Sequence, residues 1–274
     1  MSDDIRARYP AITDDEWAQL VWPTIGLTTD PSAGDPVVGQ YGGDPLLPDG
    51  MWWPEWEGVG PLSFGVSLDC AALSALDPGF ALPTDGTLLF FCHDRQVEPE
   101  LFVDTSFPGT QAGARVVYVP EGTPVRPQAA PQPLVTHPAL PLRAVPDRTV
   151  VHVESPYYDA LNAGRSDADR ADLAQARSDV LDAGRAATHQ VGGYPLVGQG
   201  DIVSRVVGMK LGRLPYDSPI WTMEADRWVT LLGVNAHIPS TMPWGNLGKV
   251  FWLIRREDLA VNDFGEAIMD WSNI

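Results

Sequence analysis

The sequence predicts an α+β protein, predominantly antiparallel β, with tandem-duplicated sheet-rich repeats and a few peripheral helices. The first observation is a repeated motif, because Gln-x-Gly-Gly-x-Pro-Leu occurs at residues 40–46 and again at 190–196. The second is that strand-like segments follow each copy in the same order. The third is a proline-rich stretch at 119–150, which favours extended chain that crosses between the copies. These observations indicate an internal duplication.

Two segments carry helix signals. A capping box at residues 13–16 predicts a short helix that stops near Pro23, because proline cannot continue a helix. Residues 166–183 predict a second helix, with Ser166 as its N-cap and Gly184 just past its end. The apolar stripe of this helix is thin, so we expect it on the outside of a sheet.

Four segments are predicted to be strands. They are residues 61–69 and 85–91 in the first half, and 228–235 and 246–253 in the second. Gly86 aligns with Gly248, whereas the preceding strands can be aligned in two registers. In one register Phe64 aligns with Leu232, and in the other Asp69 aligns with Asn235. We prefer the second register. The chain is therefore expected to be a single domain, 1–274, with repeats at about 36–118 and 186–274.

The two copies of the motif have a structural explanation. Paired glycines permit positive φ angles, and a proline two residues later fixes the direction in which the chain leaves. Each copy is predicted to form a rigid corner before a strand. The residues of the two corners are Gly42, Gly43 and Pro45, and Gly192, Gly193 and Pro195.

The composition excludes several classes of protein. The net charge of −18 argues against a nucleic-acid-binding protein and against docking on an anionic membrane. Residues 1–57 carry 11 acidic and 2 basic side chains, which suits a basic protein partner, although the acidity would also serve solubility alone. No apolar run is long enough to span a bilayer and no secretory signal is visible, so we expect a cytoplasmic protein.

Signatures of catalysis and of metal binding are absent from the sequence. It has no phosphate-binding loop, no dinucleotide fingerprint and no zinc-protease motif. Cys70 and Cys92 lack CxxC spacing, and the five histidines lack ligand spacing. We therefore expect no metal and no cofactor. We favour a binding function over catalysis, and an enzyme remains the alternative.

One polar set is present in the second copy of the motif and missing from the first. It comprises His189, Tyr194, Gln199 and Asp201. Polar residues that break the symmetry of a duplicated scaffold are candidates for function. The hypothesis is that Asp201 orients the imidazole of His189 beside a cleft roofed by Trp244. The alternative is that these residues tie a loop to the sheet.

Tryptophan is abundant, with ten residues, and most of these are expected in the core. The cluster of Trp52, Trp53 and Trp56 lies in a proline-flanked loop and cannot easily face inward as a whole. It forms either a lid over the sheet or a recognition surface for a protein or a carbohydrate.

A set of motifs resembles the YwqG-like family. In the first half these are Gly-Gly-x-Pro-x-x-Pro-x-Gly-x-x-Trp-Pro from Gly42 and Leu-Pro-x-x-Gly-x-Leu-x-Phe-Phe from Leu82. In the second half they are the run from His189 to Asp201, Trp-Gly-Asn-x-Gly from Trp244, and Arg-Glu-Asp-Leu from Arg256.

The resemblance covers about residues 35–274 and implies a cytoplasmic bacterial protein of mixed α and β structure, without an established activity. The sequence departs from the family pattern at Tyr41, Ser67, Gly233 and Asn246. If these positions bind a ligand in the family, this chain has lost or changed it.

Binding is thus the expected function, with Asn246 and Trp244 added to the candidate site. The leading hypothesis is a non-catalytic protein that neutralises a partner protein, in the manner of an immunity protein. The alternative is a small-molecule or carbohydrate-binding protein, or an enzyme, that uses a cleft between the repeats.

Overall fold

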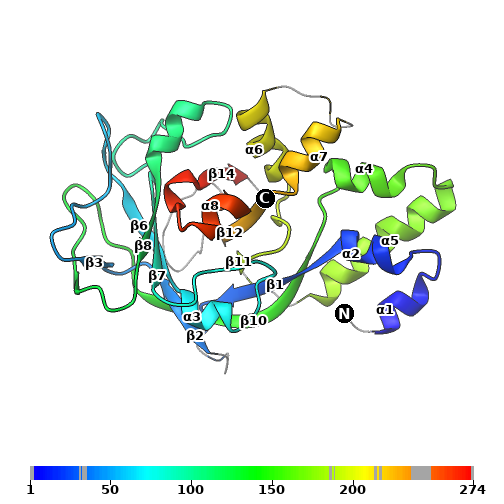
Figure 1. Cartoon of the computed structure of the whole chain (residues 1–274), viewed down its shortest axis with the longest axis horizontal. Helices are drawn as coiled ribbons and strands as arrows, with labels where there is room; N and C mark the ends of the chain where they lie inside the picture. The colour runs from blue at the N-terminus through cyan, green and yellow to red at the C-terminus, as the bar shows by residue number, and fades with distance from the viewer. Residues whose placement is uncertain are drawn as a thin grey trace.

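The computed structural model describes residues 3–30, 32, 36–184, 187, 189–212, 215, 218–235 and 248–272. In these residues the main feature is an antiparallel sheet of ten strands (Figure 1). Its strands, in chain order, are β1 (Val21–Thr28), β2 (Val37–Tyr41), β6 (Ser63–Asp69), β7 (Thr87–Cys92), β8 (Ala114–Val119), β10 (Leu140–Val150), β11 (His189–Val191), β12 (Trp228–Asn235), β13 (Lys249–Arg255) and β14 (Ile268–Ser272). Two short antiparallel pairs stand apart from it, namely β3 (Leu46–Pro48) with β9 (Val125–Pro127), and β4 (Glu55–Trp56) with β5 (Gly60–Pro61).

The order of strands across the sheet is symmetric about its centre. It runs β14-β13-β12-β11-β1-β10-β2-β6-β7-β8, so four strands from each half of the chain flank the central pair β1 and β10. The central strands are exchanged between the halves. β1 precedes the first Gly-Gly motif but lies beside β11 of the second half, while β10 lies beside β2 of the first.

Helices cover one side and one end of the sheet. In chain order they are α1 (Asp3–Arg8), α2 (Asp14–Leu20), α3 (Cys70–Ser74), the 3-10 helix η1 (Pro108–Gly113), α4 (Pro156–Asn162), α5 (Asp167–Ala183), α6 (Ile202–Leu211), α7 (Pro219–Ala225), α8 (Arg256–Ala260) and the 3-10 helix η3 (Phe264–Glu266). Figure 1 shows α1, α2, α4 and α5 gathered on one side, with α6 and α7 at the top. None of the helices in the described ranges is long and apolar enough to cross a membrane.

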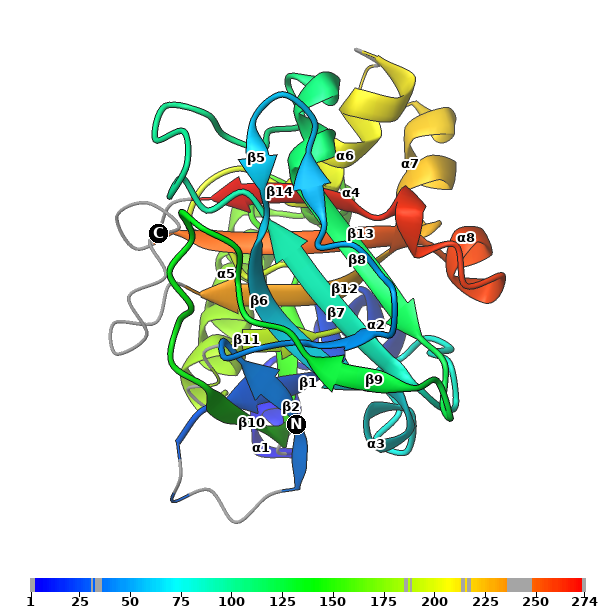
Figure 2. The same cartoon turned by 90° about the vertical axis from the view of Figure 1, so that its left-hand side faces the viewer.

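The sheet curls until its two edges meet. Gln111, just before β8, donates to the carbonyl of Met269 in β14 (2.8 Å) and accepts from its N–H (2.9 Å). The ring of Tyr118 in β8 lies 5.6 Å from that of Phe264, which precedes β14. Figure 2 looks onto the strands of the first half, with β13 and β14 behind them. The two edge strands are thereby shielded, which protects their free backbone groups from pairing with other chains.

The inside of the curled sheet holds the main hydrophobic core. Both halves contribute to it, as the contact between the rings of Phe90 and Trp252 at 5.3 Å illustrates. A second cluster lies outside the sheet, where α1, α2, α4 and α5 pack around Trp17, Leu20 and Leu173. Cys70 and Cys92 are buried free thiols, and burial raises the pKa of Cys70 to about 12.

Several predictions from local sequence are confirmed. The protein is mainly antiparallel β with a few helices. The strand predicted at 228–235 is β12, and the helix predicted at 166–183 is α5, with Ser166 accepting from the N–H of Asp169. The capping box of Thr13 and Glu16 is present at the start of α2. Gly184 differs from expectation, because it ends α5 in an extended conformation with φ −64°.

The proline-rich segment was expected to be extended crossing chain, but its last part is β10, the longest strand. β10 contains Pro141 and Pro146, which would normally argue against a central strand. However, β2 pairs only with residues 140–143 of β10, and β1 pairs only with residues 143–150. Each proline thus has a neighbouring strand on one side only, so its missing N–H costs no ladder hydrogen bond.

Candidate functional site

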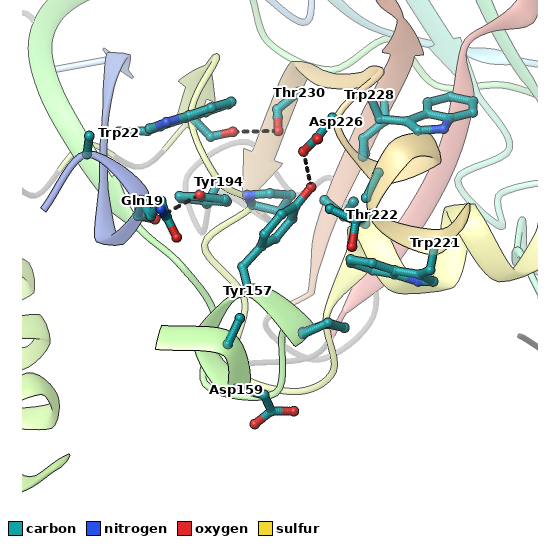
Figure 3. Close-up of a pocket in the computed structure, with 18 of the residues that line it drawn as sticks. Gln19, Trp22, Tyr157, Asp159, Tyr194, Trp221, Thr222, Asp226, Trp228 and Thr230 are labelled. Atoms are coloured by element: carbon teal, nitrogen blue, oxygen red, sulfur yellow. Dashed lines mark hydrogen bonds between the residues drawn. The ribbon is translucent and has the colours of Figure 1, made fainter. Parts of the chain in front are cut away.

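A cavity of about 1120 Å³ opens where the helices meet the end of the sheet. Its walls come from α2, α4, α6 and α7, and its floor comes from the second Gly-Gly corner and the adjoining ends of β12 and β13. Figure 3 shows aromatic side chains on several sides of this cavity. The aromatic lining residues are Trp22, Tyr157, Tyr194, Trp221 and Trp228.

The corner in the floor is rigid because its polar groups bond to one another. Gln190 donates to the carbonyl oxygens of Gly192 and Tyr194, both at 2.9 Å. Thr149 of β10 accepts from the N–H of Tyr194 at 2.7 Å. Gly193 has φ +69°, and a Cβ there would lie 2.3 Å from the hydroxyl of Thr149. Only glycine fits that position, so the floor has a fixed shape.

Two pairs of aromatic rings form the walls. Trp22, at the start of β1, stacks on Tyr194 with the ring centroids 5.0 Å apart. The phenol of Tyr194 donates to the carbonyl of Gln19 at 2.9 Å, which ties the corner to α2. On the other side, Tyr157 of α4 meets Trp221 of α7 edge to face at 5.6 Å.

A buried charge cluster holds the ring of Trp228 in place. Glu224, only 5% exposed, accepts from the indole N–H of Trp228 at 2.8 Å. The same carboxylate accepts a hydrogen bond from Arg255 at 2.7 Å. The guanidinium of Arg255 lies 5.2 Å from the centroid of the Trp228 ring. Arg227 completes the cluster at 3.0 Å from Glu224.

The mouth of the cavity is polar. Exposed side chains surround it, namely Gln19, Asp159, Thr222, Asp226 and Arg256. The phenol of Tyr157 donates to the carboxylate of Asp226 at 2.5 Å, and Figure 3 shows this bond from α4 to the end of α7. Burial, followed by this hydrogen bond, raises the pKa of Tyr157, so the phenol remains a neutral donor. An apolar floor with a polar mouth is the usual form of a binding site for organic molecules.

The structure places the predicted polar set in different surroundings. Tyr194 lines the cavity. His189 is buried in β11, where it accepts from the N–H of Asn235 at 3.1 Å and stacks on Tyr41. Asp201 instead caps α6, accepting from the N–H and the hydroxyl of Ser204.

No contact joins Asp201 to His189 among the described residues. The imidazole that acts electrostatically on Asp201 is that of His152. The side chain of Gln199 is exposed, while its carbonyl accepts from Ser272 at 3.0 Å. Trp244 and Asn246 lie outside the described residues. The set is therefore divided, with Tyr194 at the cavity and Asp201 at a helix start.

The three tryptophans of the predicted loop also lie in different surroundings. Trp53 donates from its indole N–H to the carbonyl of Leu62 at 2.7 Å and packs on Phe91. Trp56 packs edge to face on His93. Trp52, in contrast, is 91% exposed. Two of the three side chains thus cover the sheet, and one is exposed to solvent.

The first Gly-Gly corner has a different environment. Asp44 and Pro45 beside it line a smaller hollow of about 530 Å³, and none of the described residues that line this hollow is aromatic. Within the described ranges, no group of three or more His, Cys, Asp or Glu side chains is placed to hold a metal ion.

Sequence reasoning missed Trp22, Tyr157, Trp221 and Asp226 as cavity residues. They come from three separate segments, namely β1, α4 and α7 with its C-terminal cap, and belong to no local motif. The abundance of tryptophan was the only signal, and it pointed to the loop at residues 51–56 instead.

The fold and site together define a curled antiparallel β-sheet protein with an aromatic-lined cavity at one end. A family model described as a domain of unknown function (DUF1963) matches residues 39–272, and the chain belongs to this family. No curated protein matches the chain.

Proposed function

We propose that this chain is a binding protein that holds a small organic molecule in the aromatic cavity. The observation that carries the proposal is the cavity itself, with its volume of about 1120 Å³, its aromatic walls and its polar mouth. Burial of an apolar ligand surface against such walls supplies binding energy, and the polar groups fix its orientation.

The rigidity of the walls supports the proposal. Hydrogen bonds hold the ring of Trp228 and the corner at Gly193, and stacking holds Trp22 against Tyr194. A preformed site loses less conformational entropy when a ligand binds, so more of the contact energy appears as affinity.

A substitution that fills the cavity tests this function. Ala160 of α4 lines the cavity and is exposed, so Ala160→Trp should occupy the ligand's place without removing a packed side chain. The control is Ala174→Trp on the exposed face of α5.

With 4-phenyl-1-butanol as the probe, we expect saturable changes in tryptophan fluorescence and a rise in melting temperature for the parent chain and the control. Ala160→Trp should abolish both changes. An equal response in all three proteins would place the binding elsewhere.

A second proposal is that the chain binds a basic partner protein, with neutralisation of that partner as its role. The exposure of Trp52, at 91%, and the net charge of −18 support it. An exposed tryptophan is the side chain most enriched at energetically dominant contacts between proteins.

We also propose that the two halves of the sheet descend from one duplicated unit, and that the chain is YwqG-like and cytoplasmic. The duplication is supported by strand pairing, since Gln40 stands opposite Ser67 as Gln190 stands opposite Gly233. Both glutamines donate to the carbonyl of the first glycine of their corner, at 2.8 and 2.9 Å. Relatives that lack one of the two corners would contradict a duplicated origin.

A further inference from the structure

We infer that the molecule held in the aromatic cavity is an organic cation, an amine or guanidinium carried on an apolar body. This inference rests on the proposed function and specifies its ligand. The apolar body would lie against the aromatic walls, and the positive charge would lie at the mouth.

Charges at the mouth favour a cation. Asp159 and Asp226 are acidic there, and Arg256 is the basic lining residue. Among the described residues, neither carboxylate forms an ion pair with a basic side chain. Arg256 is turned to the main chain, with its Nε donating to the carbonyl of Asp226 at 3.4 Å. Two carboxylates are thus left for a ligand.

The hydrogen bond from Tyr157 to Asp226 fixes the orientation of one of these carboxylates. The phenol donates to Oδ1 of Asp226 at 2.5 Å. Because its pKa is raised, first by burial and then by the hydrogen bond, the phenol does not compete with a ligand as a second negative charge. Oδ2 is left to accept from an ammonium or guanidinium group.

Among the described residues that line the deeper part of the cavity, none offers an unpaired charge to a ligand. The carboxylate of Glu224 behind the wall is already bonded to Arg227 and Arg255. Apolar side chains such as Pro195, Val203 and Leu253 line the cavity. A charged group would lose its hydration there without compensation, so the ligand's charge belongs at the mouth.

Two general effects act in the same direction. Aromatic faces attract cations within about 6 Å of the ring. The net charge of −18 also raises the local concentration of cations around the chain.

A series of probes with one body and three charges tests the inference. The probes are 4-phenylbutylamine, 4-phenyl-1-butanol and 4-phenylbutyric acid, titrated into the full chain at low salt and followed by tryptophan fluorescence. We expect the amine to bind about fivefold more tightly than the alcohol, as for one partly exposed ion pair, and the acid to bind most weakly. Asp226→Asn should lower the ratio of amine affinity to alcohol affinity to about one.

The matched control is Asp182→Asn, which makes the same charge change on the exposed end of α5. It should leave the ratio of amine to alcohol affinity intact. Equal affinities for the amine and the alcohol, or tightest binding of the acid, would overturn the inference while leaving the proposed binding function in place. If none of the three probes binds, both proposals fail.

Discussion

Glu224 helps to set the shape of the cavity wall although it is not itself a lining residue. Its carboxylate is buried and bonded to the indole of Trp228 and to two arginines. A buried charge of this kind is retained only while it is paired, because an unpaired charge in the interior is strongly destabilising. The side chain of Arg255, 23% exposed, depends on Glu224 in the same way.

We expect Glu224→Ala to lower the free energy of unfolding by about 3 kcal/mol, because it leaves Arg255 partly buried without its partner. Glu257→Ala is the matched control. Glu257 bonds to Arg227 at 2.7 Å but is 53% exposed, so its loss should cost less than about 1 kcal/mol. Urea denaturation of both variants measures the difference, and equal losses would show that burial is not what makes Glu224 important.

At the scale of elements, the central strands were the hardest part of the fold to foresee. β12 and α5 were predictable because their signals are local, an apolar run in one and a Ser166 cap in the other. β10 carries two prolines, and only the staggered pairing of its neighbours makes them acceptable. No local pattern reports which strand lies beside another, so the exchange of β1 and β10 could not be read from the sequence.

The candidate site likewise contains residues that a local sequence pattern identifies and residues that it does not. Tyr194 was singled out because it is polar and absent from the first copy of the motif, and Gly193 because it belongs to the repeated corner; both line the cavity. Trp22 and Asp226 were missed because more than two hundred positions separate them. Asp201 was assigned to a site because it is polar and absent from the first copy, whereas its oxygen atoms cap α6.

A break in the chain at the exposed turn around Gly122 tests the exchange of strands. Fragment 1–121 then carries β1 and β2 without β10, which lies between them. Fragment 122–274 carries β10 and β11 without β1. We expect neither fragment to fold alone, and the two to copurify as a one-to-one complex when they are produced together.

Circular dichroism of each fragment and of the complex provides the measurement. A break at Gly164, in the turn between α4 and α5, is the control, because fragment 1–164 keeps β10 between β1 and β2. This fragment should retain β structure. Independent folding of fragment 1–121 would refute the view that the exchanged strands hold the halves together.

At the scale of the whole molecule, the net charge determines which other charged molecules are attracted to the protein. A net charge of −18 repels other anions and attracts basic surfaces, and this attraction is screened beyond about 10 Å at 0.1 M salt. In the proposed complex with a basic partner, electrostatic steering and contact by Trp52 are expected to be separable, because salt weakens the first and leaves the second.

With an arginine-rich peptide as the probe, we expect affinity for the full chain to fall steeply between 20 and 300 mM salt. Trp52→Ala should weaken binding about tenfold at every salt concentration, as for the loss of a dominant contact. Val135→Ala, which removes another exposed apolar side chain (70% exposed), should have little effect. Biolayer interferometry measures all three, and salt-independent binding would rule out steering by the acidic surface.

The position of β1 also has a consequence for synthesis of the chain on the ribosome. β1 is made early, but its neighbours β10 and β11 begin only at Leu140 and His189. At a synthesis rate of roughly 5–20 residues per second, β1 remains unpaired for on the order of ten seconds or more before its neighbouring strands are made. Its side chains Ile25 and Leu27, almost fully buried in the finished fold, are exposed during that time. Pairing over such sequence distances is slow, so we expect nascent chains of this protein to need chaperones or low temperature to escape aggregation.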